Sequence, residues 1–183
     1  MYNPLIVFLA EGLADAGYST LRFNFPYREN GRKTPDSQSV LVLTWQCVYE
    51  FFKEEAGCRM NKIIATGKSM GGIVASRMVA EGLLPVDGLV FFGYPLHSPG
   101  EKERMRDGHL YQINIPMLFF AGTRDPFCDL AKLKEVLDRL DYSRDLVTID
   151  GGDHSFDLPE SAETSQQDVY NLILNKTVEW MDH

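Results

Sequence analysis

The chain has 183 residues, of which 44% are hydrophobic and 24% are charged, and its formal net charge is −8. These values are typical of a globular protein, and we expect residues 1–183 to form a single domain. The negative charge disfavours nucleic acid and anionic membranes as partners. The sequence contains no run of about 18 apolar residues, so it does not predict a membrane span.

The three cysteines are Cys47, Cys58 and Cys128. They lack the C-x-x-C spacing of many zinc sites and are too few for a disulfide framework, so we expect no metal and a reducing, cytoplasmic location. The apolar start of the chain has no basic segment before it, so it is not interpreted as a signal peptide.

The first third of the chain predicts a helix over residues 4–16, a strand over 18–23 and, after a polar loop, a long helix from Ser37 or Ser39 to near Gly57. The first helix is amphipathic, because Leu5, Leu9 and Leu13 fall at helical spacing. Gly17 follows as a natural stop.

Strands alternate with helices over the rest of the chain. The expected strands cover residues 62–66, 88–93, 117–121 and 145–149. The expected helices cover 71–81, 129–140 with Asp129 as N-cap, and 163–180, with a helical turn around 101–106 inside a long irregular stretch. The strands are apolar on both faces, which predicts an α/β fold whose mostly parallel sheet is covered by helices on both faces.

A Gly-x-Ser-x-Gly motif joins the strand at 62–66 to the helix that follows, and it reads Gly67-Lys68-Ser69-Met70-Gly71. This context is typical of a nucleophile elbow, in which glycines two residues to either side avoid collisions with neighbouring backbone. Ser69 is then the candidate nucleophile, and the Met70 backbone N–H is a candidate oxyanion donor. The alternative is a glycine-rich turn with an idle serine. The motif is not interpreted as a phosphate-binding loop, because Lys62 stands where that motif needs its first glycine.

A base and an acid follow two later strands. Serine alone is a weak nucleophile and needs an adjacent base. His154 stands in the loop after the last strand, and Asp125 directly follows the preceding one, where sheet enzymes place catalytic groups. The chain order Ser–Asp–His is that of α/β-hydrolases. We expect His154 to take the proton of Ser69, and Asp125 to fix the tautomer of His154.

Simpler explanations exist for both residues. Asp125 precedes a proline and could be an ordinary turn aspartate, and His154 could be an ordinary loop histidine. Asp153 and Asp129 are the alternative acids, although Asp129 fits better as a helix cap.

Four motifs together resemble a small α/β-hydrolase family of bacterial predicted hydrolases and their testis-expressed 30-like and chromatin-complex subunit 3-like eukaryotic relatives, distantly similar to dienelactone hydrolases. The motifs are Gly67-Lys68-Ser69-Met70-Gly71-Gly72, Gly93-Tyr94-Pro95-Leu96-His97, Gly122-Thr123-Arg124-Asp125-Pro126 and Gly152-Asp153-His154-Ser155-Phe156. The likeness covers essentially the whole chain. It implies the same triad of Ser69, Asp125 and His154.

This chain departs from the family at its start. Members begin with strands ahead of the first helix, the last of which ends in a loop that donates a second oxyanion N–H. We therefore expect an N-terminally truncated α/β-hydrolase domain that lacks the usual N-terminal strands. The strand at 18–23 would then pair differently, for example directly with the strand at 62–66.

The irregular stretch at 94–115 leaves its strand at the catalytic edge of the sheet, so it could line or cover a substrate pocket. Its candidate residues are Tyr94, His97, Met105, His109 and Tyr111. A packed surface loop explains them equally well. Lys68 could attract an anionic substrate or be a plain surface lysine.

The sequence thus predicts a carboxylesterase-like serine hydrolase that acts on a small ester or thioester through an acyl-enzyme, without a cofactor. The alternative is a non-catalytic binding or scaffold subunit with the same fold. The substrate and the oligomeric state stay open.

Overall fold

The structure is a computed structural model that describes residues 3–56 and 61–183. The predicted helix end near Gly57 and the thiol of Cys58 lie outside these residues. The chain forms two compact units, Met1–Asn61 with Ile173–His183, and Lys62–Leu172. No helix in the described part is both long and apolar enough to cross a membrane.

The first unit is helical. It contains α1 (Pro4–Asp15), α2 (Pro26–Glu29), α3 (Gln38–Ala56) and the C-terminal part of α6 (Gln166–Met181). Helix α1 confirms the predicted first helix. Asn3 caps it, because its side-chain oxygen accepts a hydrogen bond from Ile6 N at 3.2 Å. Leu5, Leu9 and Leu13 form its buried face, as their spacing predicts.

The predicted strand at 18–23 is wrong. Residues 18–25 run as an irregular segment with no ladder partner in the described chain, so the suggested pairing with 62–66 is also absent there. Phe23 instead packs edge-on against Trp45 of α3, with ring centroids 4.8 Å apart. The apolar residues that indicate a strand are thus partly buried by packing on a helix.

The second unit carries a parallel sheet of four strands in the order β1-β2-β3-β4, as the sequence predicts. The strands are β1 (Ile64–Lys68), β2 (Gly88–Phe92), β3 (Met117–Gly122) and β4 (Arg144–Ile149). Every residue of β2 and β3 is buried, whereas β1 and β4 are partly exposed. Aromatic rings stack between the two central strands. The ring centroids of Phe92 and Phe120, for example, are 5.5 Å apart.

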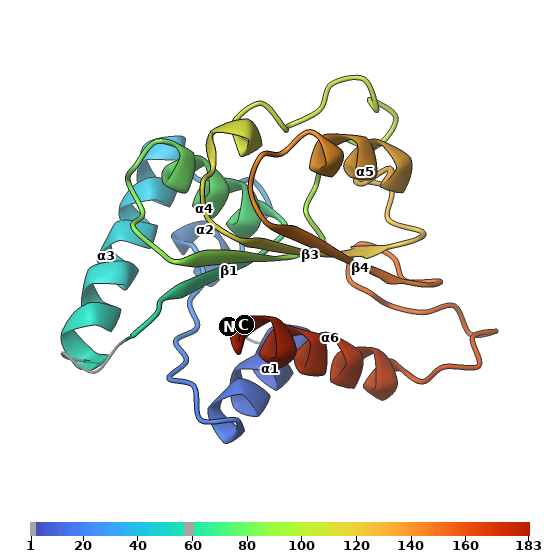
Figure 1. Cartoon of the computed structure of the whole chain (residues 1–183), viewed down its shortest axis with the longest axis horizontal. Coiled ribbons are helices and arrows are strands. Elements are labelled where there is room, and N and C mark those ends of the chain that lie inside the picture. Colours follow the sequence, from blue (N-terminus) through green and yellow to red (C-terminus); the bar gives the residue numbers. More distant parts are fainter. Residues whose placement is uncertain (1–2, 57–60) are drawn as a thin grey trace. The chain divides into compact units, whose positions relative to one another are not determined.

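Helices α4 (Met70–Ala80) and α5 (Leu130–Asp138) follow β1 and β3 and lie on the same side of this sheet (Figure 1). The predicted cap of α5 is confirmed, since the Asp129 carboxylate accepts hydrogen bonds from the first backbone N–H groups of the helix. All strands point the same way, so the loops that follow β1, β3 and β4 leave one edge of the sheet.

The predicted helical turn at 101–106 is wrong. This segment forms only turns, and the one helical turn of the loop is a 3-10 helix, η2, at Leu110–Gln112. Arg106 explains the difference, because its backbone N–H donates to Leu96 O at 2.7 Å and its guanidinium to Pro95 O at 3.0 Å. These long-range bonds replace the local ones that a helix would need.

Candidate active site

Ser69 stands on a sharp turn between β1 and α4. Its backbone has φ 53° and ψ −118°, a strained conformation for a residue with a side chain. Two hydrogen bonds hold the turn, one from Ser69 N to Phe92 O at 3.2 Å and one from Gly72 N to Ser69 O at 3.0 Å. The Ser69 hydroxyl is therefore presented at the N-terminal end of α4.

The glycines around Ser69 differ in what surrounds them. A Cβ on Gly67 would come within 2.2 Å of Gly72 N, so Gly67 is required for the close approach of strand and helix. The same expectation for Gly71 is wrong, because a Cβ there would meet nothing within 4 Å. Gly72 is the tight position instead, because a Cβ there would come within 2.9 Å of the Phe91 ring.

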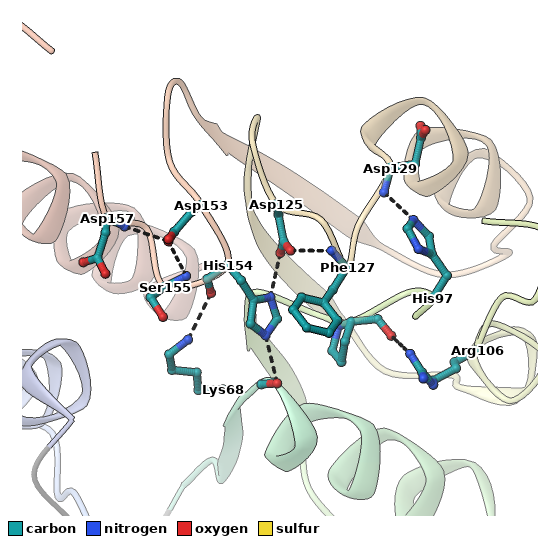
Figure 2. Close-up of polar contacts among 12 residues, drawn as sticks. Lys68, His97, Arg106, Asp125, Phe127, Asp129, Asp153, His154, Ser155 and Asp157 are labelled. Carbon is teal, nitrogen blue, oxygen red and sulfur yellow. Dashed lines mark hydrogen bonds and ion pairs between the residues drawn. The ribbon is translucent and has the colours of Figure 1, made fainter. Parts of the chain in front are cut away.

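The structure brings Asp125, His154 and Ser69 together in one hydrogen-bonded chain. His154 Nδ1 lies 2.8 Å from Asp125 Oδ2, and His154 Nε2 lies 2.9 Å from Ser69 Oγ (Figure 2). Because a carboxylate can only accept, Nδ1 carries the proton and the lone pair of Nε2 faces the serine. This is the arrangement in which a histidine can take a proton from a serine.

The Asp125 carboxylate is fully buried, while 18% of the His154 side chain is exposed. Burying a carboxylate is costly unless both oxygens have donors. Here Oδ2 faces His154, and Oδ1 accepts from Phe127 N at 2.8 Å. The loop after β3 therefore holds Asp125 ready for the histidine, with no freedom to reach solvent.

The alternative acids have other tasks. Asp153 accepts hydrogen bonds from Ser155 N at 2.7 Å and Asp157 N at 3.0 Å, which folds the loop that carries His154. Asp129 caps α5 and pairs with Lys102 at 2.6 Å. Both ring nitrogens of His154 are already bound elsewhere, so neither Asp153 nor Asp129 serves as its acid.

Two neighbours of His154 are not identifiable as such from the sequence. The Phe127 ring packs against the His154 ring with centroids 4.6 Å apart. Lys68 donates from Nζ to the His154 carbonyl oxygen at 3.0 Å (Figure 2). The sequence marks them only by their positions. Lys68 directly precedes the candidate nucleophile, and Phe127 stands two residues after the candidate acid.

Most of the predicted pocket residues build the loop rather than line an open site. Tyr94 and His97 are each only 1% exposed. The Tyr94 hydroxyl donates to Arg106 O at 2.7 Å, and His97 binds Ser98 O and Asp129 N through its two ring nitrogens. The roles proposed for Met105, which is half-buried, and Tyr111, which donates to Asp107 at 3.0 Å, stay predictions.

The structure contains a second serine–histidine pair, in which Ser76 Oγ lies 2.8 Å from His109 Nε2. The hydroxyl protons of Ser76 and Tyr94 both go to backbone carbonyls, so His109 Nε2 must be the donor to these oxygens. A donor cannot act as base toward the same serine. Ser76 is also fully buried, and burial lowers the pKa of His109 to about 4. This pair is therefore structural.

No cluster of three or more metal-ligating side chains occurs among residues 3–56 and 61–183. A surface hollow of about 330 Å³ lies between α5 and β4, lined by residues that include Lys134, Leu137 and Arg144. Its lining includes none of Ser69, Asp125 and His154, so we do not assign the chemistry to it.

The chain matches the model of the α/β hydrolase domain over residues 1–182, and it belongs to that family. The parallel sheet and the positions of its helices are those of the α/β-hydrolase fold, as the sequence predicts.

Solved structures with this fold come from several bacteria. An α-β serine hydrolase homologue from Coxiella burnetii has a TM-score of 0.73 and 19% identity, covering 96% of this chain and 77% of its own. A dienelactone hydrolase from Anabaena variabilis has a TM-score of 0.69 and 23% identity, covering 95% and 78%. A serine hydrolase without lid from Xanthomonas campestris has a TM-score of 0.71 and 20% identity, covering 98% and 75%. At these identities the likeness is one of fold.

Proposed function

We propose that this chain is a carboxylesterase-like serine hydrolase that cleaves small esters or thioesters through an acyl-enzyme on Ser69. The observation that carries the proposal is the hydrogen-bonded chain from Asp125 through His154 to Ser69, with 2.8 and 2.9 Å between the bonded atoms. Membership of the α/β-hydrolase family supports it, because this fold places nucleophile, acid and base after strands in this order.

In the first half of the reaction, Ser69 Oγ attacks the carbonyl carbon of the substrate while its proton passes to His154 Nε2. The carbonyl oxygen takes the negative charge. The Met70 N–H, at the first position of α4 where no intrahelical acceptor exists, is the proposed donor to this oxyanion. The leaving alkoxide or thiolate then departs with the proton from His154, and the acyl group stays on Ser69.

In the second half, a water gives a proton to His154 as its oxygen attacks the acyl carbon. The bond from the acyl carbon to Ser69 Oγ breaks, Oγ regains a proton from His154, and the carboxylic acid leaves. Asp125 stays ionised throughout, holds the Nδ1–H tautomer and stabilises the imidazolium that forms in each half.

Two features support an ester with an apolar part as the substrate. The half-buried Phe127 ring packs on His154 at 4.6 Å and offers an apolar surface beside the reacting atoms. The relatives named as serine hydrolases and as a dienelactone hydrolase favour ester chemistry. The narrower kinship with the testis-expressed 30-like and chromatin-complex subunit 3-like proteins is a hypothesis that rests on the four motifs alone.

Labelling with a fluorophosphonate probe tests the proposal, because such probes react with activated serines. We expect the wild-type chain to be labelled, Ser69→Ala to lose the label and Ser76→Ala to keep it. The Ser76 variant is the matched control, since it removes a second serine whose hydroxyl lies beside a histidine ring. An unlabelled wild-type protein would favour a non-catalytic binding or scaffold subunit.

A further inference from the structure

Lys68 directly precedes Ser69 and reaches the loop that carries the base. It is the last residue of β1, and its Nζ donates to the backbone oxygen of His154, 86 residues later, at 3.0 Å. The nucleophile and the base are therefore connected twice. One connection is the Oγ–Nε2 hydrogen bond of 2.9 Å, and the other runs through the Lys68 side chain. Figure 2 shows Lys68 extended toward His154 and turned away from the Phe127 side of the ring.

The His154 carbonyl lies in a fixed position between two elements. On one side it lies against Gly93, where a Cβ would come within 2.8 Å of the His154 oxygen and 3.5 Å of its Nδ1. On the other side it accepts the hydrogen bond from Lys68. Hydrogen bonds from a charged donor are shorter and stronger than neutral ones. The Lys68 hydrogen bond therefore ties the His154 backbone to the end of β1, while contact with Gly93 limits its approach to β2. The ring is attached to the backbone held in this way.

The charges around Lys68 argue against a substrate anion as its partner. Burial lowers the pKa of the Lys68 ammonium, and the nearby carboxylates of Asp125, Asp153 and Asp157 oppose that shift. The three carboxylates offset the positive charge of the ammonium, which already donates to a carbonyl, so its attraction for an anionic ligand is weakened. Its surroundings fit an internal contact.

We propose that Lys68 is a positioning residue for the Ser69 site: by holding the His154 carbonyl, its side chain keeps the base within hydrogen-bonding distance of the serine. Lys68 does not touch the reacting atoms and acts only through His154. The inference rests on the proposed function of Ser69.

The test compares Lys68→Met, which keeps the length but removes charge and donor, with Lys68→Arg, which keeps both. The readouts are the rate constant of fluorophosphonate labelling, and kcat and KM for a neutral short-chain aryl ester. Since small displacements of a catalytic group cost up to about 100-fold in rate, we expect Lys68→Met to lower labelling and kcat by roughly 10- to 100-fold, with KM changed by less than about threefold. Lys68→Arg should recover most of the rate.

Two controls separate positioning from a loss of folding. Lys134→Met removes an exposed lysine from α5 and should leave every readout unchanged. The thermal midpoint of Lys68→Met is measured beside the rates, because this variant leaves the His154 carbonyl without its donor and loss of such a hydrogen bond costs stability. If it falls, Lys68→Gln provides a neutral donor and should label faster than Lys68→Met.

The outcomes distinguish the two proposals. A wild-type chain that is not labelled, or a Ser69→Ala variant that still is, would overturn the proposed function. A labelled wild type with Lys68→Met labelled at the same rate would overturn only the role of Lys68. A rise in KM confined to anionic esters, with kcat unchanged, would also overturn it, since that result describes a substrate-binding lysine.

Discussion

Gly122, the last residue of β3, lies against the carbonyl oxygen of Gly152, so closely that a Cβ on Gly122 would come within 2.2 Å of that oxygen. The contact joins the loop that carries Asp125 to the loop that carries His154. A hydrogen bond from Arg124 N to Gly152 O at 2.9 Å holds the two loops in the same close approach. The 2.8 Å distance between Asp125 and His154 thus depends on backbone packing as well as on the two side chains.

Gly122→Ala should therefore both destabilise the protein and slow its reaction with a fluorophosphonate. Overpacking of this kind typically costs about 1–3 kcal/mol in the free energy of unfolding, and here the obstacle is backbone. Urea unfolding and the labelling rate are the measurements. Gly108→Ala is the matched control, because its Cβ would meet nothing within 4 Å. Equal stability of the two variants would contradict the close contact.

The two outer glycines of the Gly-x-Ser-x-Gly motif should respond differently to the same change. Gly67→Ala places a methyl group on the backbone of Gly72, so we expect a large loss of folded protein or of labelling. Gly71→Ala should be stable and labelled within a few-fold of wild type, because its methyl group would meet nothing within 4 Å and alanine favours a helix more than glycine does. Similar behaviour of both variants would show that the turn is not packed as described.

Asp125→Asn tests the acid. The amide would turn either its NH₂ group, which cannot accept a hydrogen bond, or its less basic oxygen toward His154 Nδ1. The tautomer with the proton on Nδ1 and a lone pair on Nε2 would therefore be less stabilised. We expect kcat for a neutral ester to fall by about 10²–10⁴-fold with little change in KM. Asp153→Asn, whose amide oxygen can still accept from Ser155 and Asp157, should retain most activity. The reverse ranking of the two variants would assign the acid to Asp153.

The half-buried His109 predicts how the free energy of unfolding depends on pH. Burial lowers the pKa of His109 from 6.5 to about 4, so the unfolded chain binds a proton more readily than the folded one between these values. The stabilisation is present above about pH 6.5 and is lost as pH falls toward 4. We expect a loss of roughly 2 kcal/mol, since partial exposure of the ring reduces the full effect.

Urea unfolding at pH 4.5 and 7 measures this dependence, and His109→Gln should weaken it. Glutamine can still donate to Ser76 and Tyr94 but does not titrate in this range. An unchanged pH dependence in His109→Gln would place the responsible group elsewhere.

The parallel sheet could be predicted from the sequence because its central strands are apolar on both faces, which is a local property. The meeting of Ser69, Asp125 and His154 could be anticipated as well, because each follows a strand of one parallel sheet and such ends share an edge. Their catalytic roles stay predictions until they are tested.

Features that depend on tertiary contacts could not be predicted. Residues 18–23 have the composition of a strand, but Phe23 packs on a helix instead. Tyr94 and His97 have the polarity of pocket residues, yet their polar atoms bind the backbone of the loops around them. The contact of Lys68 with the His154 loop depends on how that loop folds over β2, and no local pattern encodes it.

The central claim is that His154 activates Ser69 to form an acyl-enzyme. Rapid mixing with a short-chain aryl ester, acid quenching and mass spectrometry of the digested protein test it most directly. The account predicts a burst of the aryl product and an acyl group on the peptide that contains Ser69, both lost in Ser69→Ala and strongly slowed in His154→Ala. An acyl group on another residue, or turnover that survives in Ser69→Ala, would contradict the account.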